Sequence, residues 1–160
     1  MKPSLLLASV FAALLGGCQA SATPAVAAAR PPEFFPTPLK ANPPLPFSEA
    51  VRVGDMLYLA GQLGVAPGAA QVVPGGIGTE ARQVMDNIKA VLGRHGTSLD
   101  HVVKCTVFLA DIKEWPAFNA VYREFFKSDF PARSAFGTTG LAFGARVEVE
   151  CIAWIPPVAK

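Results

Sequence analysis

The 160-residue sequence predicts one α+β domain, in which a mostly antiparallel sheet carries two helices on one face. Two observations support this fold class. Segments with strand and helix patterns follow one another in the order strands, helix, strand, helix, strands, and the last strand alternates between an apolar and a mixed face. Residues 47–157 are long enough to bury a core of their own, so we expect a single domain there.

The first 18 residues have the pattern of a secretory signal peptide with a lipobox. Lys2 is basic, residues 5–15 form an apolar run too short to span a membrane as a stable helix, and the sequence LGGC ends at Cys18. A cysteine in this position resembles the bacterial lipobox, in which the thiol is lipidated. We therefore expect a protein of the periplasm or outer surface, lipid-anchored at Cys18. The alternative is a soluble secreted protein, cut within residues 25–29.

Residues 19–46 have the composition of a linker. Ser, Thr and Ala give way to repeated prolines: Pro31, Pro32, Pro36, Pro38, Pro43, Pro44 and Pro46. Proline fixes φ and has no N–H, so it favours an extended chain and excludes a helix or a central strand. We expect a tether between the membrane and the domain.

The sheet is predicted to begin with a β-hairpin. Residues 50–53 and 56–63 are apolar runs on either side of a short turn that contains Gly54. The glycine- and proline-rich stretch 67–78 is then expected to be a loop, with a short strand at Gln71–Val73.

An amphipathic helix is predicted from Thr79, as N-cap, up to the stretch Gly93–Gly96. Its apolar residues recur at helical spacing: Ala81, Val84, Met85, Ile88, Val91 and Leu92. Gly96 is suited to the left-handed conformation that often follows a helix. His95, in the last turn, is expected to face solvent and to complement the helix dipole.

A strand at residues 102–109 and a second helix at 111–126 follow, and the last two strands are predicted at 132–138 and 146–155. The final strand has one apolar face, formed by Val147, Val149, Cys151, Ala153 and Ile155. Its other face mixes charged and large residues: Glu148, Glu150, Ile152 and Trp154. Because two helices cover only one face of the sheet, we expect other subunits to cover this second face.

Arg133 and Glu148 are the candidate site residues. Each interrupts a segment that otherwise has the pattern of a buried strand. An unpaired ionised group in an apolar interior costs several kcal/mol or more, so each should meet either a partner or a ligand. The alternative is a structural ion pair at a subunit interface.

The composition argues against several other functions. A formal net charge of +2 and 16% charged residues offer no basic stripe, so we do not expect a nucleic-acid partner. Neither histidine, His95 or His101, stands at ligand spacing from a cysteine or carboxylate, so no metal site is predicted. Cys105 and Cys151 lie in apolar strand patterns, where an oxidising compartment would permit a disulfide but spacing alone cannot reveal the pairing.

Seven segments, in order and at matching spacing, resemble the RidA/YjgF family of enamine/imine deaminases. They are Phe47–Val51, Leu59–Gln62, Ala81–Leu92, Val103–Leu109, Phe118–Tyr122, Pro131–Ser134 and Val147–Glu150. The resemblance covers the whole domain and implies a chorismate-mutase-like homotrimer, with sheets facing inward and active sites between neighbouring subunits. It also implies a cofactor-free reaction, the hydrolysis of enamine and imine intermediates of amino acids to 2-oxo acids and ammonia.

The resemblance also implies roles for single residues. The arginine that matches Arg133 binds the carboxylate of the imino acid substrate, and the glutamate that matches Glu148 positions the attacking water. Asn119 and Gly61 match residues that lie near or line the cleft.

Three positions depart from the family pattern, because Phe47, Ala60 and Ala135 stand where archetypal members have Tyr, Ser and Cys. We expect Phe47 and Ala135 still to line the substrate site. Ala135 retains a backbone carbonyl, the kind of group to which water activation in the family is partly ascribed. The alternative that these substitutions favour is a non-catalytic trimeric binding module for small carboxylates.

Overall fold

A computed structural model of the chain describes residues 30–38, 43–127 and 129–157. In sequence order the elements are β1 (Glu33–Pro36), β2 (Ser48–Val53), β3 (Met56–Leu59), β4 (Gln62–Leu63), α1 (Ile77–Arg94), β5 (Val102–Leu109), α2 (Trp115–Tyr122), β6 (Ala132–Gly137) and β7 (Val147–Trp154). Short 3₁₀ helices occur at Leu99–His101, Ile112–Glu114, Arg123–Phe125 and Ala142–Gly144. Cys18 and the predicted signal peptide lie outside the described residues. Neither α1 nor α2, nor any other helix of the described ranges, is long and apolar enough to cross a membrane.

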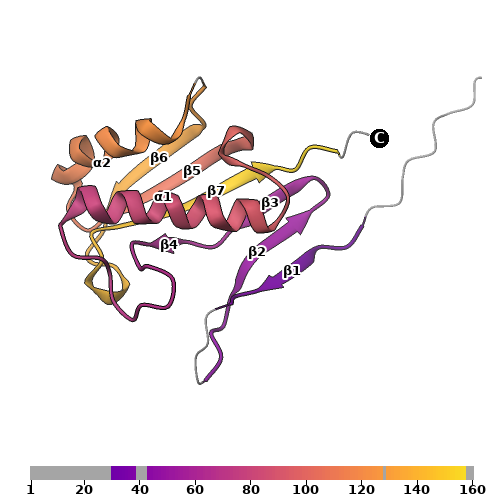
Figure 1. Ribbon diagram of the computed structural model, residues 1–160, viewed down its shortest axis with the longest axis horizontal. Helices are drawn as coiled ribbons and strands as arrows, with labels where there is room; N and C mark the ends of the chain where they lie inside the picture. Colours follow the sequence, from indigo (N-terminus) through magenta and orange to yellow (C-terminus); the bar gives the residue numbers. More distant parts are fainter. Residues whose placement is uncertain (1–29, 39–42, 128, 158–160) are drawn as a thin grey trace, which may run out of the picture.

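The strands form one sheet in the order β1-β2-β3-β7-β5-β6, and β4 pairs with β7 beside this path. The two α-helices lie on the same face of this sheet (Figure 1). Neighbouring strands run antiparallel except β5 and β6, which run parallel. The predicted fold class, a mostly antiparallel sheet with two helices on one face, is confirmed.

The alternation in β7 divides the sheet into two faces. Val147, Val149 and Cys151 are at most 2% exposed and lie in the core with α1 and α2. The residues between them are half-buried or exposed. Because successive strand side chains point to opposite faces, the helices cover one row and leave the other on the helix-free face. The two-faced strand predicted from the sequence is confirmed.

The predicted hairpin is present, but its second strand is interrupted. The run predicted over residues 56–63 is divided into β3 and β4, with Ala60 and Gly61 between them. The expected strand at Gln71–Val73 is absent from this described stretch, where only an isolated bridge joins Val65 to Val72. The many glycines and prolines of this loop disfavour a continuous ladder of backbone hydrogen bonds between paired strands.

The helices differ in detail from the prediction. α1 begins at Ile77, so Thr79 is not its N-cap, and the Thr79 hydroxyl instead donates to the carbonyl of Gly75 at 3.5 Å. Gly96 has a φ of 76°, which confirms the predicted left-handed position after the helix. The helix predicted over residues 111–126 is a composite of two 3₁₀ turns around α2.

His95 does not face solvent as expected. Its side chain is only 11% exposed, and Nε2 lies 3.1 Å from Oε2 of the buried Glu49, which Arg94 also binds. The His95 ring packs against Phe35 of β1, with 4.2 Å between ring centroids. The sequence could not reveal this, because the glutamate lies 46 residues away in β2.

The sheet begins upstream of residue 47. Its edge strand β1 lies inside the stretch that was predicted to be a linker.

A disulfide joins Cys105 of β5 to Cys151 of β7, which are directly opposite each other in the antiparallel ladder. Both residues are at most 2% exposed and belong to the core between sheet and helices. The bond therefore links two neighbouring strands of the sheet within the core. The sequence left this pairing open, and the register resolves it.

This disulfide predicts a measurable contribution to stability. The cysteines are 46 residues apart, and closing a loop of that size in the unfolded chain corresponds to about 4 kcal/mol. We expect the C105A/C151A double variant to lose up to this amount of unfolding free energy in denaturant titrations. A reductant should destabilise the wild type and leave the double variant unchanged. Equal effects of reductant on both proteins would contradict the prediction.

Candidate functional site

Arg133 lies on the helix side of the sheet, at its edge strand β6. It is paired in register with the fully buried Cys105 of β5, so its side chain points towards the helices. There its Nη2 donates to Oδ1 of Asn119 in α2 at 2.7 Å. The guanidinium also lies 4.5 Å from the ring centroid of Tyr122 and 5.7 Å from that of Phe118. A hydrogen bond and cation–π contacts therefore hold the cation in one orientation.

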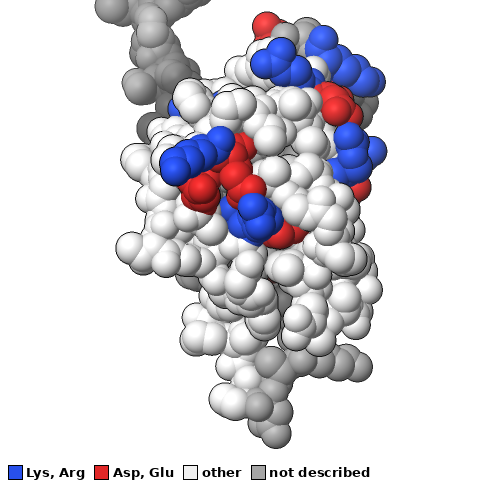
Figure 2. Space-filling model, turned by 90° about the vertical axis from the view of Figure 1, so that its left-hand side faces the viewer, with Lys and Arg blue, Asp and Glu red and all other residues white. Residues whose placement is uncertain are grey.

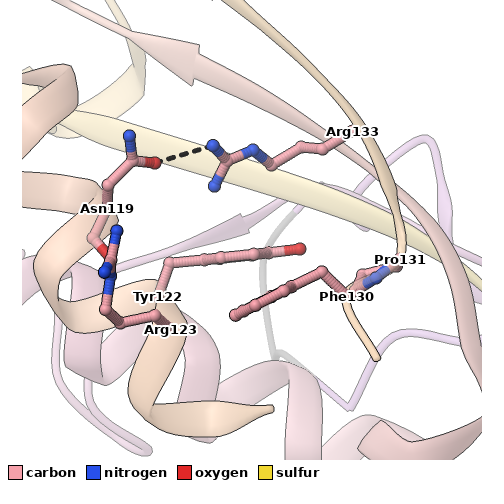
Figure 3. Close-up of a pocket in the computed structure, with 6 residues that line it drawn as sticks. All are labelled: Asn119, Tyr122, Arg123, Phe130, Pro131 and Arg133. Atoms are coloured by element: carbon pink, nitrogen blue, oxygen red, sulfur yellow. Dashed lines mark hydrogen bonds between the residues drawn. The ribbon is translucent and has the colours of Figure 1, made fainter. Parts of the chain in front are cut away.

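A cavity of about 260 Å³ opens beside this guanidinium. Its lining comes from α2, the turn after it and the start of β6: Asn119, Tyr122, Arg123, Phe130, Pro131 and Arg133 (Figure 3). The Tyr122 and Phe130 rings extend towards each other across the view, while Arg133 and Asn119 meet above them. The cavity thus combines aromatic walls with a fixed cation, a suitable lining for a small organic carboxylate.

The Tyr122 hydroxyl is a buried group without a hydrogen-bond partner in the described part of the chain. Burial raises the pKa of Tyr122 to about 12, against the opposing effect of the positive charge of Arg133. The phenol therefore stays protonated at neutral pH and keeps an unused donor. A buried donor without a partner costs free energy unless a ligand accepts its hydrogen bond.

Glu148 lies on the opposite, helix-free face. It is paired in register with Phe108 of β5, three residues after Cys105, and an odd number of steps along a strand reverses the direction of the side chain. Burial raises the pKa of Glu148, and the neighbouring charge of Glu150 adds to the rise. Such a carboxylate accepts a proton more readily than an exposed one.

Gly61 explains how the Glu148 carboxyl is seated. A Cβ on Gly61 would lie 1.9 Å from Oε1 of Glu148, which is far inside van der Waals contact. Glycine at the break between β3 and β4 therefore leaves the space that the carboxyl occupies. The neighbouring Leu63 of β4 is paired in register with Glu148.

One chain therefore carries two separate groups of site residues. Asn119 and Arg133 meet on the helix side, where Ala135 packs against the core, while Gly61 and Glu148 meet on the other face. Phe47, directly before β2, has a half-exposed side chain. The sheet separates the two groups within one chain.

Four cavity residues were not predicted as site residues: Tyr122, Arg123, Phe130 and Pro131. Tyr122 and Arg123 lie within the predicted second helix. Both could have been found from spacing, because positions i+3 and i+4 from Asn119 share its helix face. Phe130 precedes the Pro131–Ser134 segment and carried no separate signal.

The site shows no features of a metal centre or a strong basic patch. No group of three or more histidine, cysteine, aspartate or glutamate side chains capable of holding a metal occurs in the described ranges. Acidic and basic side chains lie close together at the end of the molecule where α2 lies (Figure 2). Arg82–Glu124 and Arg146–Glu114 are ion pairs of the described residues.

Known proteins share both the sequence pattern and the fold. Residues 39–155 match the family described as Endoribonuclease L-PSP. A protein of Capra hircus named 2-iminobutanoate/2-iminopropanoate deaminase is 47% identical over 108 residues, which cover 68% of this chain and 79% of the relative.

Two solved structures extend the similarity to the fold. RidA from an Antarctic Psychrobacter species is 37% identical with a TM-score of 0.66, covering 69% of this chain and 89% of that chain. E. coli TdcF with bound serine is 30% identical with a TM-score of 0.65, covering 68% of this chain and 87% of that chain. The chain therefore belongs to the Endoribonuclease L-PSP family, the RidA/YjgF family that its sequence resembles.

Proposed function

We propose that this protein is an enamine/imine deaminase, which hydrolyses reactive enamine and imine intermediates of amino acids to 2-oxo acids and ammonia. The observation that carries this proposal is the fixed guanidinium of Arg133 at a cavity of suitable size for a small carboxylate. The deaminase name of the goat relative supports the same reaction. The serine bound to E. coli TdcF indicates that this fold can hold an amino-acid-like ligand.

Arg133 is proposed to bind the substrate carboxylate. Its Nη2 donates to Asn119, and the residue lines the cavity. Arginine can grip a carboxylate in two parallel charge-assisted bonds, each worth about 1.5–3 kcal/mol. This grip would place the C=N carbon at a fixed distance from the guanidinium.

Glu148 is proposed to orient and activate the attacking water. With its raised pKa it can take a proton from water as the oxygen bonds to the imine carbon, and can return a proton to the nitrogen. The C–N bond then breaks, and one water and one imine give one 2-oxo acid and one ammonia. The arrangement requires no redox change.

Because Arg133 and Glu148 lie on opposite faces of one sheet, we propose that the complete site forms between chains of a homotrimer. Large side chains on the helix-free face support such an assembly, since Tyr58, Phe136 and Trp154 are 44%, 53% and 40% exposed. The position of Arg133 on the edge strand β6 makes it accessible to a neighbour. A neighbour that covers this face would supply the missing half of the site.

We further propose that the chain is exported and lipid-anchored at Cys18. The lipobox-like sequence before Cys18 supports this location. The buried disulfide supports it independently, because such bonds persist mainly in oxidising compartments. Radiolabelled palmitate incorporation into the full chain, lost in a C18A variant, tests the anchor against a soluble secreted form.

The direct test of the function is imine hydrolysis. A 2-imino acid generated by an amino-acid oxidase should disappear faster when the protein is added. A wild-type protein that binds 2-oxo acids without accelerating imine loss would instead indicate the non-catalytic binding module.

Replacing Arg133 by alanine should reduce kcat/KM for imine hydrolysis by about 100-fold or more, because the carboxylate loses its charge-assisted bonds. R133K should recover only part of the loss, since an ammonium cannot form the planar fork. R82A removes an exposed arginine from the Glu124 ion pair and serves as the control with full activity. Equal activity of R133A and wild type would exclude the proposed role.

The raised pKa of Glu148 predicts a distinctive pH dependence. Activity should fall as pH drops through a value above the ordinary 4.5, and E150Q should move this limb to lower pH by removing the neighbouring charge. A raised carboxyl pKa in the folded state destabilises the fold at neutral pH. E148Q should therefore be inactive yet have a higher Tm than wild type at pH 7, a difference that vanishes below about pH 4.5. A lower Tm for E148Q at pH 7 would contradict this.

Adding a methyl group at Gly61 should impair activity more than stability. The new Cβ would displace the carboxyl end of Glu148, which is flexible, rather than backbone. We expect G61A to lower kcat substantially while Tm changes little. G93A, at an open glycine position in α1, provides the control. A normal kcat for G61A would show that catalysis does not depend on the position of the Glu148 carboxyl beside Gly61.

A further inference from the structure

The cavity beside Arg133 contains a second guanidinium. Arg123 lines the same cavity, and its Nε donates to the backbone carbonyl of Asn119 at 3.3 Å. Arg133 donates to the side-chain oxygen of that same residue. Figure 3 shows both arginines directed towards Asn119 from opposite sides of the cavity. Both arginines of this cavity thus donate to the same asparagine.

Neither of these two charges is neutralised by a carboxylate of the described residues. Other arginines of the fold form ion pairs: Arg52 with Asp55, Arg82 with Glu124, Arg94 with Glu49 and Arg146 with Glu114. Arg123 and Arg133 form no such pair within the described ranges. An anion bound in the cavity that both residues line would supply the opposite charge that no carboxylate of the described residues supplies.

The Tyr122 hydroxyl is a further, independent indication of a ligand. Tyr122 is 3% exposed, lines the cavity, and its hydroxyl has no hydrogen-bond partner in the part of the chain that the structure describes. A buried hydroxyl donor in the lining of a cavity can donate a hydrogen bond to a carboxylate oxygen of a ligand. The cavity therefore offers more positive and donor groups than one carboxylate requires.

We infer that the cavity selects imino acids with a second carboxylate, the 2-imino derivatives of acidic amino acids, whose side-chain carboxylate binds Arg123 while Arg133 binds the α-carboxylate. This inference rests on the proposed function and specifies its substrate class. The chemistry is unchanged: water adds to the C=N carbon, the C–N bond breaks, and the products are a 2-oxo dicarboxylic acid and ammonia. The aromatic rings of Tyr122 and Phe130 form walls beside the carbon chain between the two carboxylates.

The test compares two imines on the full chain. Glutamate oxidase generates 2-iminoglutarate, and an L-amino-acid oxidase generates 2-iminobutanoate. We expect R123Q to lower kcat/KM for 2-iminoglutarate by about 10- to 100-fold, the loss of one charge-assisted carboxylate contact, and to change 2-iminobutanoate by less than about twofold. R123K should restore part of the selectivity. K89Q, which removes an exposed charge from α1, is the control for net charge.

Two results would overturn the inference. In the first, R123Q has the same kcat/KM as wild type for both imines. This result would leave the proposed deaminase function intact. In the second, R123Q weakens the oligomer on size-exclusion chromatography and slows both imines equally, which would make Arg123 an interface residue.

Binding separates this inference from the proposed function itself. If wild type hydrolyses neither imine, the deaminase proposal fails. Calorimetry with 2-oxoglutarate and 2-oxobutanoate then decides the selectivity: the inference predicts tighter binding of 2-oxoglutarate to wild type and loss of this preference in R123Q. Equal affinity of wild type for the two oxo acids would overturn it.

Discussion

The two-residue period of the β-strand is the constraint on which the functional account depends. Arg133 pairs with Cys105 of β5, and Glu148 pairs with Phe108 of the same strand. Cys105 and Phe108 are an odd number of positions apart, so the cation and the carboxylate must point to opposite faces of the sheet. No rotamer change can bring them together through a packed core. The chain therefore presents two separate groups of candidate site residues, which the proposed homotrimer would join across two chains.

Local packing fixes each half-site separately. On the helix side, Asn119 and the Tyr122 ring orient Arg133, and the row that contains Arg133 continues through Cys105 to the disulfide with Cys151. On the other face, the missing side chain of Gly61 makes room for Glu148. The same row of residues therefore contains both the disulfide between β5 and β7 and the cation of Arg133.

Much of this arrangement could be predicted from the sequence, because alternation along a strand is a local signal. The two faces of β7 and the anomalous charges of Arg133 and Glu148 were visible in this way. Contacts between distant segments were not: the pairing of Cys105 with Cys151 depends on register, and the burial of His95 depends on Glu49 in β2. The unpartnered hydroxyl of Tyr122 likewise emerges only when the helix is packed on the sheet.

The most direct measurement is complementation between two inactive variants. R133A and E148Q each lack one of the two proposed half-sites. In the proposed homotrimer, a mixed trimer should contain one intact site, at the junction where an E148Q chain supplies Arg133 and an R133A chain supplies Glu148. Random exchange at equal amounts should recover about a quarter of wild-type imine hydrolysis, since a closed ring with both variants has one such junction. Activity that stays at the level of the separate variants after verified subunit exchange would contradict the account.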